Sequence, residues 1–219
     1  YHIGSQITDI KPFTDSAKKV LSLINELKKI KINLTHVDLG GGLGISYNDE
    51  SLAQRGDYVR SLIEVFKGTK LKLIFEPGRS IVGDAGILVT KVIEKKNNPN
   101  GKNFIIVDAG MNDLIRPPLY GAYHKISSVK EHTASAALFD VVGPVCETAD
   151  FFGKDRHITA DIGDIVVIQD AGAYGFVLSS NYNSRPRIAE YLISNNNVTC
   201  IRGRETFSDI LGDEEKYLG

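Results

Sequence analysis

The sequence is poor in sulfur and has no tryptophan, since its 219 residues include two cysteines and one methionine. Two cysteines cannot build the disulfide framework of a small secreted protein, so the chain fits a reducing cytoplasm. No apolar run reaches the roughly 18 residues that a transmembrane helix needs. We recognise no signal peptide either. These absences predict a globular protein of the cytoplasm.

An excess of charge of either sign is also missing, with 26 Lys and Arg against 27 Asp and Glu. The chain therefore offers no basic field for nucleic acid or for a membrane surface. Its 42% hydrophobic and 24% charged residues are typical of a globular protein, and its length allows one large domain or two small ones. Because the chain starts at Tyr1 and enters a motif at once, we expect a fragment of a longer protein.

The first part of the chain alternates helix and strand patterns. Apolar residues at spacings of three and four, from Ala17 to Ile30, predict an amphipathic helix over 15–30. A strand is predicted at 36–39 and another at 71–75. This order indicates a parallel sheet or a (β/α) barrel.

A second helix is predicted between the two strands. It should start at Ser51, because Gln54 completes the spacing of a capping box. Its predicted buried stripe comprises Leu52, Val59, Leu62, Ile63 and Phe66.

The loops after the two strands carry candidate chemistry. The strand at 71–75 delivers Glu76 and Arg79 at its end, with a forced turn between them. The glycine run 40–44 would let backbone N–H groups approach an anion, and phosphate is the usual guest. Its spacing fits neither a Walker loop nor a dinucleotide fingerprint, so a flexible turn is an equally good interpretation.

The second part of the chain changes to β patterns. Short strands separated by turns predict a β-sandwich or barrel-like domain. The predicted strands are 86–93, 104–107, 137–146, 164–169, 188–193 and 198–201. Residues 171–182 read as a short helix and 206–211 as a terminal one. We place the boundary near residue 82, which predicts a βα part over 1–82 and a β part over 83–219.

Several motifs match one known family in the same order along the chain. They are His2–Gln6, Asp38–Gly44, Glu76–Arg79, Asp108–Asp113, Arg116–Tyr120 with Ala122 and His124, Gly143–Asp150, Asp170–Tyr174 and Asn181–Pro186. In these motifs the chain resembles the diaminopimelate decarboxylases, which are pyridoxal-phosphate enzymes related to the ornithine and arginine decarboxylases. The first three would fit any decarboxylase of this group. Arg116–Tyr120 and the pair Cys146-Glu147 point to the diaminopimelate branch.

The resemblance implies both a fold and a reaction. Residues 1–82 would be the last βα units of an alanine-racemase-like (β/α)8 barrel, and 83–219 a β domain whose segment 171–182 returns to the active site. The reaction would be the decarboxylation of meso-2,6-diaminopimelate to L-lysine and CO2, the final step of lysine biosynthesis. The lysine that forms the Schiff base with the cofactor has no match here, so the isolated piece is expected to be inactive.

The resemblance also assigns residues to pyridoxal 5'-phosphate. Glu76 would face the pyridine nitrogen and keep it protonated, and His2 would stack on the ring and act in catalysis. Ser5 would hydrogen-bond the cofactor near its phosphate. The implied cofactor-binding set is His2, Ser5, Gly40, Gly41, Gly42, Glu76, Pro77, Gly78, Arg79 and Tyr174.

A second implied set would hold the substrate and move a proton. Guanidinium groups suit carboxylates, so Arg79 and Arg116 would bind them together with Tyr120. The implied substrate-binding set is Arg79, Arg116, Tyr120, Glu147 and Tyr174, with Glu147 at the distal ammonium group. Cys146 would be the catalytic acid that reprotonates the carbanion, while Cys200 is attributed to packing. The family supplies its Cys and Glu from the partner subunit, which implies a homodimer with shared active sites. No metal is expected.

Other functions are open at this point. A related decarboxylase could act on carboxynorspermidine or a basic amino acid, although Arg116 with Tyr120 suggests a second carboxylate to hold. A non-catalytic binding protein resembling a decarboxylase is a different class, and Cys146 with the cofactor residues speaks against it. A structural β domain without ligand fits the density of motifs least well.

Overall fold

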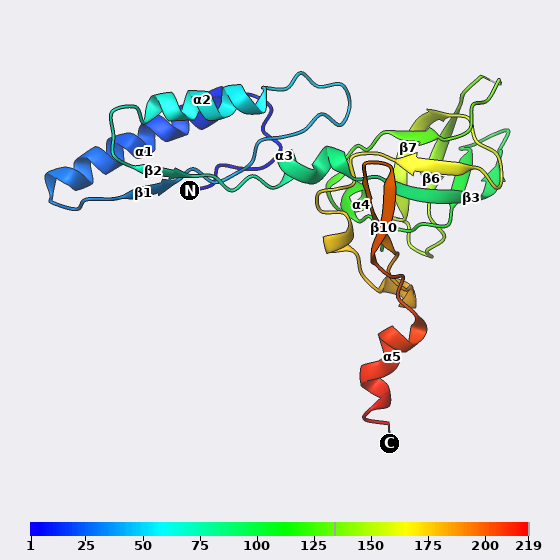
Figure 1. Cartoon of the computed structure of the whole chain (residues 1–219). Helices are drawn as coiled ribbons and strands as arrows, with labels where there is room; N and C mark the ends of the chain where they lie inside the picture. The colour runs from blue at the N-terminus through cyan, green and yellow to red at the C-terminus, as the bar shows by residue number, and fades with distance from the viewer. Residues whose placement is uncertain (134, 219) are drawn as a thin grey trace. The chain divides into compact units, whose positions relative to one another are not determined.

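The structure is a computed structural model that describes residues 1–133 and 135–218, and it contains two compact units, Tyr1–Gly86 and Ile87–Gly219 (Figure 1). The first unit is α/β and the second is mainly β. The assignment of 1–82 and 83–219 as separate domains stays a prediction.

The α/β unit is built on two short parallel strands. Strand β1 (His36–Asp38) pairs with β2 (Lys72–Ile74), so that Val37 lies opposite Leu73. Helices α1 (Lys11–Lys29) and α2 (Arg55–Val65) lie next to each other along this pair (Figure 1). The unit ends in α3 (Arg79–Val82) and the 3-10 turn η1 (Gly83–Ala85).

Helix α1 confirms the predicted amphipathic helix and begins four residues earlier than expected. Pro12 stands in its first turn, where a missing N–H costs nothing. Phe13 and Ala17 are buried in the core, and the Phe13 ring lies edge-on to Tyr58 at 4.8 Å. Ile30, which the pattern placed on the buried face, caps the helix and is 67% exposed.

The start of helix α2 and part of its buried face differ from the prediction. It begins at Arg55 with Gln54 as N-cap, and no side chain caps it, so the capping box from Ser51 is wrong. Val59 and Ile63 are 37% and 51% exposed, whereas Leu62 and Phe66 are buried as predicted. Leu62 and Phe66 belong to the apolar cluster that α2 forms with α1 and the strand pair, and Val59 and Ile63 lie outside that cluster.

The β unit contains a six-stranded sheet in the order β5-β8-β3-β4-β6-β7. The strands are β3 (Leu88–Lys96), β4 (Phe104–Val107), β5 (Ile126–Ser128), β6 (Ala137–Val142), β7 (Phe151–Ile158) and β8 (Ile165–Ile168). Only β4 and β6 pair in parallel among these neighbours. The edge strands β5 and β7 contact each other, so the sheet is nearly closed like a barrel. Its core includes Phe152, Ile105 and Val141.

Several elements of this sheet differ from the sequence-based prediction, and the short strand β5 was not predicted. Strand β6 ends at Val142, not at residue 146, because 143–150 forms a turn. Strand β7 was not predicted, because the run from Lys154 to His157 hides its apolar alternation. The short helix α4 (Arg116–Tyr120) was also not predicted, and two prolines stand in its first turn.

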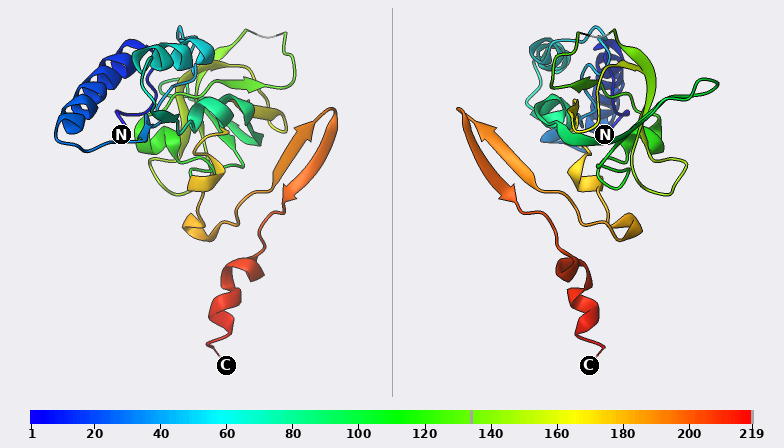
Figure 2. Two further views of the ribbon diagram at one scale, coloured as in Figure 1. Left: turned by 60° about the vertical axis from the view of Figure 1, so that its left-hand side comes forward. Right: turned by 90° about the vertical axis from the view of Figure 1, so that its right-hand side faces the viewer.

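The chain beyond the sheet forms separate elements that Figure 2 shows projecting from it. Strands β9 (Glu190–Ser194) and β10 (Asn197–Arg202) make an antiparallel hairpin, and helix α5 (Phe207–Glu215) follows. Residues 171–182 contain only the 3-10 turn η2 (Phe176–Leu178), not the predicted short helix, and η3 (Tyr182–Ser184) comes next. No described helix is both long and apolar enough to span a membrane.

Truncating Phe152 should destabilise the β unit strongly. Phe152 is fully buried in the sheet core, so Phe152→Ala should lower the free energy of unfolding by about 3–5 kcal/mol. Urea unfolding followed by far-UV circular dichroism measures this change. The control is Leu138→Ala on β6, because Leu138 is 43% exposed. An equal effect of the two substitutions would contradict the assigned core.

Glu205 should make the stability of the hairpin region depend on acid pH. The Arg187 guanidinium, which donates from Nε to Oε1 at 2.7 Å, lowers the pKa of Glu205 from 4.5 to about 2. A lowered carboxyl pKa contributes stability that is complete above pH 4.5 and is lost as pH falls towards 2. Glu205→Gln should therefore lose less thermal stability than wild type across this window. Glu214→Gln on α5 is the control, and an identical pH slope for Glu205→Gln and wild type would refute the assignment.

Candidate active site

The loops after β1 and β2 leave the same end of the strand pair because the strands are parallel. The hydrogen-bond ladder continues past the strands, from Leu39 N to Ile74 O and from Glu76 N to Gly40 O, each at 2.9 Å. These hydrogen bonds hold Gly40, at the start of the glycine run, next to Glu76, at the start of the Glu-Pro-Gly-Arg loop.

The glycines allow three segments of backbone to approach one another. A β-carbon on Gly41 would collide with the carbonyl oxygen of Glu76, and one on Gly42 with that of Gly4. Gly42 also has a φ of +104°, which disfavours any other residue. In the described part of the chain, the amides of Gly41 and Gly42 donate no hydrogen bond to another residue. These amides are suited to bind an anion.

Arg79 is fixed from two sides. Its Nη1 donates to the Tyr47 hydroxyl at 2.5 Å and its Nη2 to Ser5 Oγ at 3.2 Å. Its guanidinium carbon lies 5.7 Å from the centre of the Tyr47 ring. Tyr47 was not predicted as a site residue, because no motif in the loop after the glycines includes it. The fold thus brings together Ser5 and Arg79, which are far apart in sequence.

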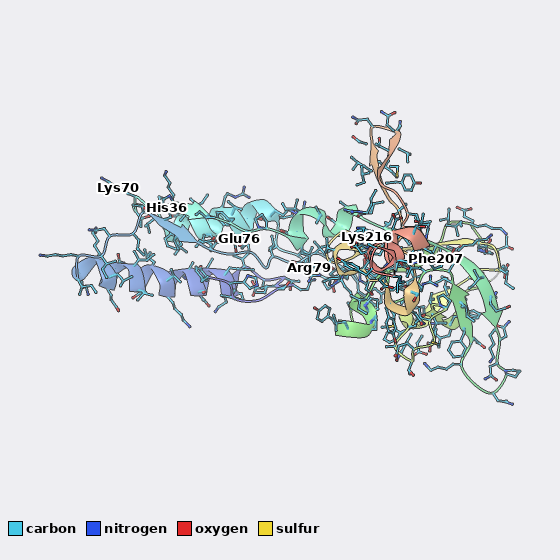
Figure 3. The ribbon with its side chains drawn as sticks, turned by 90° about the horizontal axis from the view of Figure 1, so that it is seen from below. His36, Lys70, Glu76, Arg79, Phe207 and Lys216 are labelled. Atoms are coloured by element: carbon cyan, nitrogen blue, oxygen red, sulfur yellow. The ribbon has the colours of Figure 1, made fainter. Side chains whose placement is uncertain are left out.

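His2 and Glu76, two of the predicted cofactor residues, have exposed side chains. His2 Cε1 lies 3.5 Å from where a β-carbon of Gly42 would stand, so the ring is beside the glycine run. The Glu76 carboxylate makes no hydrogen bond or ion pair with another described residue. Figure 3 shows Glu76 and Arg79 at one end of the strand pair, with His36 and Lys70 at the other. Pro77 and Gly78, both exposed, join Glu76 to α3.

Arg116 begins α4 and is only 5% exposed. Its Nη1 lies 2.9 Å from His124 Nε2, and His124 Nδ1 lies 2.8 Å from Gln169 O. Because a carbonyl oxygen only accepts and a guanidinium only donates, Nδ1 carries the proton and Nε2 accepts. The ring of His124, which is fully buried, orients this guanidinium.

The predicted tyrosines are exposed, at 66% for Tyr120 and 41% for Tyr174. Tyr120 ends α4 one turn after Arg116, so the two share one short helix. Tyr174 has a φ of +58°, an uncommon conformation for a residue other than glycine. Such strain often occurs at functional sites.

Cys146 and Glu147 lie on a turn that Asp150 holds. Asp150 accepts from Val145 N and Met111 N, each at 2.6 Å. Burial raises the pKa of Asp150 despite these two donors. The side chains of Cys146 and Glu147 are exposed on this turn.

A second loop meets this turn. The Tyr182 hydroxyl donates to Glu147 Oε2 at 3.4 Å, and Asn183 Nδ2 donates to Cys146 Sγ at 3.4 Å. Tyr182 and Asn183 belong to the motif Asn181–Pro186, but the sequence predicted no functional role for either residue. The loop of this motif therefore lies next to the turn that carries Cys146 and Glu147.

Arg185 connects this second loop to the sheet. Its Nε donates to Asn112 Oδ1 at 2.9 Å and its Nη2 to Asp108 O at 2.6 Å. Asp113 lies 4.0 Å from Arg185 Nη2, and burial is the main cause that raises its pKa.

A further titratable group lies away from these residues. His132 Nε2 is 3.0 Å from Asp164 Oδ2, and its Nδ1 is 3.9 Å from Asp161 Oδ2. Lys95 and Lys130 form ion pairs with the same two carboxylates. The positive charge beside each carboxylate favours an ion-pair cluster over a metal centre.

The predicted site residues thus form separate sets. Within the α/β unit, the structure brings together His2, Ser5, Gly40–Gly42, Glu76 and Arg79. Within the β unit, it pairs Arg116 with Tyr120 on α4 and Cys146 with Glu147 on one turn. The roles of all these residues stay predictions. The sequence assigned no role to Tyr47, Tyr182 or Asn183, which contact predicted site residues.

Known proteins of similar sequence belong to the family that the motifs indicated. The family model described as pyridoxal-dependent decarboxylase, C-terminal sheet domain, matches residues 9–172. Diaminopimelate decarboxylase from Pseudomonas aeruginosa is 47% identical over 213 residues, covering 97% of this chain and 51% of the relative. The enzyme of that name from Vibrio cholerae is 47% identical over 210 residues, covering 95% and 50%.

Solved structures give the same result. Diaminopimelate decarboxylase from Helicobacter pylori, complexed with L-lysine, has a TM-score of 0.92 at 41% identity and covers 99% of this chain and 54% of that one. The enzyme from M. jannaschi has a TM-score of 0.93 at 40% identity, with 97% and 50% covered. These likenesses and the nearly closed sheet confirm the predicted fold class.

The chain spans about half the length of the curated relatives that it matches. The family model covers most of the sequence, including both the βα part and the sheet. The chain therefore belongs to the pyridoxal-dependent decarboxylases of the ornithine, diaminopimelate and arginine group.

Proposed function

We propose that this chain is part of a diaminopimelate decarboxylase, which converts meso-2,6-diaminopimelate to L-lysine and CO2. The observation that carries the proposal is the grouping of the glycine run, His2, Glu76 and Arg79 at one end of the parallel strand pair. The names of relatives at 47% identity support the substrate. This reaction would place the protein at the last step of lysine biosynthesis, in the cytoplasm.

The residues of the α/β unit fit pyridoxal 5'-phosphate. The amides of Gly41 and Gly42 suit its phosphate, and a single carboxylate, Glu76, suits a protonated ring nitrogen. When bound, this cofactor supplies an electron sink for the bond that breaks. His2 would hold the ring plane, and Ser5 would contact the phosphate while it also fixes Arg79.

The phosphate site would have further contacts. Gly40, Pro77 and Gly78 shape the loops around Gly41, and the backbone of Arg79 would complete the cup. We assign the hydroxyl of Tyr174 to the phosphate or the substrate, on the strength of its exposed ring and strained backbone.

Substrate recognition would use several charged side chains. The Arg79 and Arg116 guanidinium groups would bind carboxylates, with Tyr120 adding a hydroxyl. A charged residue before two prolines is often only a surface charge. Arg116 is not, because it is buried and hydrogen-bonded to His124. Glu147 would bind the distal ammonium group of the substrate.

Cys146 would return a proton to the substrate. Its S–H bond breaks, and the proton forms a C–H bond with the electron pair that the departing CO2 leaves on the carbon. The sulfur keeps the electrons of the S–H bond and later takes a proton from water. The exposure of Cys146 on a fixed turn supports this role.

We further propose a homodimer in which Cys146 and Glu147 of one copy serve the cofactor residues of the other. The resemblance suggests this arrangement, and the exposure of both side chains on the turn is consistent with it. A related decarboxylase acting on carboxynorspermidine or on a basic amino acid is the second candidate, because the first three motifs would fit any decarboxylase of this group.

The complete protein, loaded with pyridoxal phosphate, should release CO2 from meso-diaminopimelate and form lysine. Lysine, ornithine and carboxynorspermidine should give little or no CO2, because they lack the second carboxylate that the arginines would hold. Glu76→Gln should lower the turnover by about 100-fold or more, since the ring nitrogen loses its partner. Preferred release of CO2 from lysine or ornithine would establish the second candidate instead. No turnover of any of these would favour a binding protein.

Mixed dimers test whether the site is shared. Glu76→Gln and Cys146→Ala should each be nearly inactive alone. When subunits exchange, about half of the dimers are mixed and each holds one intact site, so activity should recover to about a quarter of wild type. A mixture of Glu76→Gln with itself is the control. Absence of recovery, with mixed dimers shown by mass spectrometry, would place both residues in sites within one subunit.

A further inference from the structure

Two loops of the β unit converge on the Cys146 sulfur. One is the turn over 143–150, which Asp150 fastens through the amides of Val145 and Met111. The other is the loop Asn181–Arg185, from which Asn183 Nδ2 donates to Cys146 Sγ at 3.4 Å. An N–H donor aimed at a sulfur atom stabilises negative charge there more than it stabilises the neutral thiol.

The loop that carries Asn183 is fastened at both ends. Ser180 N donates to Asn112 O at 2.9 Å before it, and Arg185 donates to the Asn112 side chain at 2.9 Å after it. Asn181 Nδ2 also bonds Glu205 Oε2 at 2.7 Å. The loop therefore cannot move easily relative to the sheet, and Asn183 has a defined position.

The backbone at Asn183 is in an uncommon conformation. Asn183 has φ +62° and ψ +29°, and Ser184 has φ +55°, so two successive non-glycine residues are left-handed. Such residues cost free energy and persist where the surroundings impose them. Asparagine tolerates this conformation and can also donate from its side chain, and both properties are used here.

We propose that Asn183 is a positioning residue for the Cys146 thiol, which rests on the proposed function of Cys146 as a proton donor. By donating to Sγ, the amide leaves the S–H proton to point away from Asn183. When the proton leaves for the substrate carbon, the same N–H stabilises the thiolate. Tyr182, whose hydroxyl reaches Glu147 Oε2, fixes the neighbouring side chain from the same loop.

The test measures the reactivity of sulfur and needs no enzymatic activity. The chain is treated with iodoacetamide at one fixed pH, and the alkylation rates of Cys146 and Cys200 are followed separately by peptide mass spectrometry. Both thiols are exposed, so Cys200 is an internal standard. Asn183→Asp keeps the size and the backbone preference but removes the donor. Asn183→Gly removes the side chain and suits the left-handed backbone.

Both variants should slow the alkylation of Cys146 by about three- to tenfold relative to Cys200, because the thiolate loses a donor. Asn196→Asp and Asn196→Gly are matched controls, since Asn196 is also left-handed, at φ +66°, but lies in the β9–β10 turn. They should leave the rate at Cys146 unchanged. An unchanged or faster rate at Cys146 in either Asn183 variant would overturn the proposal.

The same variants separate this inference from the proposed function. In the complete enzyme with cofactor, Asn183→Gly should lower kcat for diaminopimelate by about three- to tenfold with little change in KM. If the Asn183 variants slow the alkylation of Cys146 but the wild-type enzyme does not decarboxylate diaminopimelate, the proposed function is refuted. The effect of Asn183 on the Cys146 thiol would still stand. Normal kcat in Asn183→Gly, in an active enzyme, would refute the positioning role.

Discussion

The parallel pairing of β1 and β2 is the constraint on which the first set of site residues depends. Parallel strands deliver the loops that follow them to one edge, so the glycine run and the Glu-Pro-Gly-Arg loop must meet. The ladder from Glu76 N to Gly40 O then fixes their register. Any side chain larger than hydrogen at Gly41 would force Glu76 away. Glycine is therefore required at position 41 for backbone packing, whether or not a ligand binds there.

In the β unit, the loops that carry predicted site residues are held by buried carboxylates instead of by hydrogen bonds between strands. Asp150 gathers the amides of two loops, and Asp113 accepts from Gly110 N at 2.9 Å beside Arg185. Burial raises the pKa of both carboxyl groups, which shows that their desolvation is not fully offset by these donors. This desolvation cost is consistent with a role in positioning, because each carboxylate fixes a loop near Cys146.

The sequence predicted the order of elements better than their faces. Alternating periodicity and ordered motifs were sufficient to predict an α/β part followed by a β part. Strand β7 could not be predicted from pattern, since its charged run masks the alternation. Tyr47 and Asn183 could not be found either, because their partners are 32 and 37 residues away in sequence. Such contacts depend on tertiary structure, and no local spacing announces them.

The clamp on Arg79 has an entropic consequence. A free arginine side chain loses up to about 2 kcal/mol of rotamer freedom when it is held in one geometry. Tyr47 and Ser5 already impose that geometry through two hydrogen bonds within the folded unit. The ordering of this side chain therefore accompanies folding, and the proposed binding of a carboxylate would not have to bear this entropic cost again.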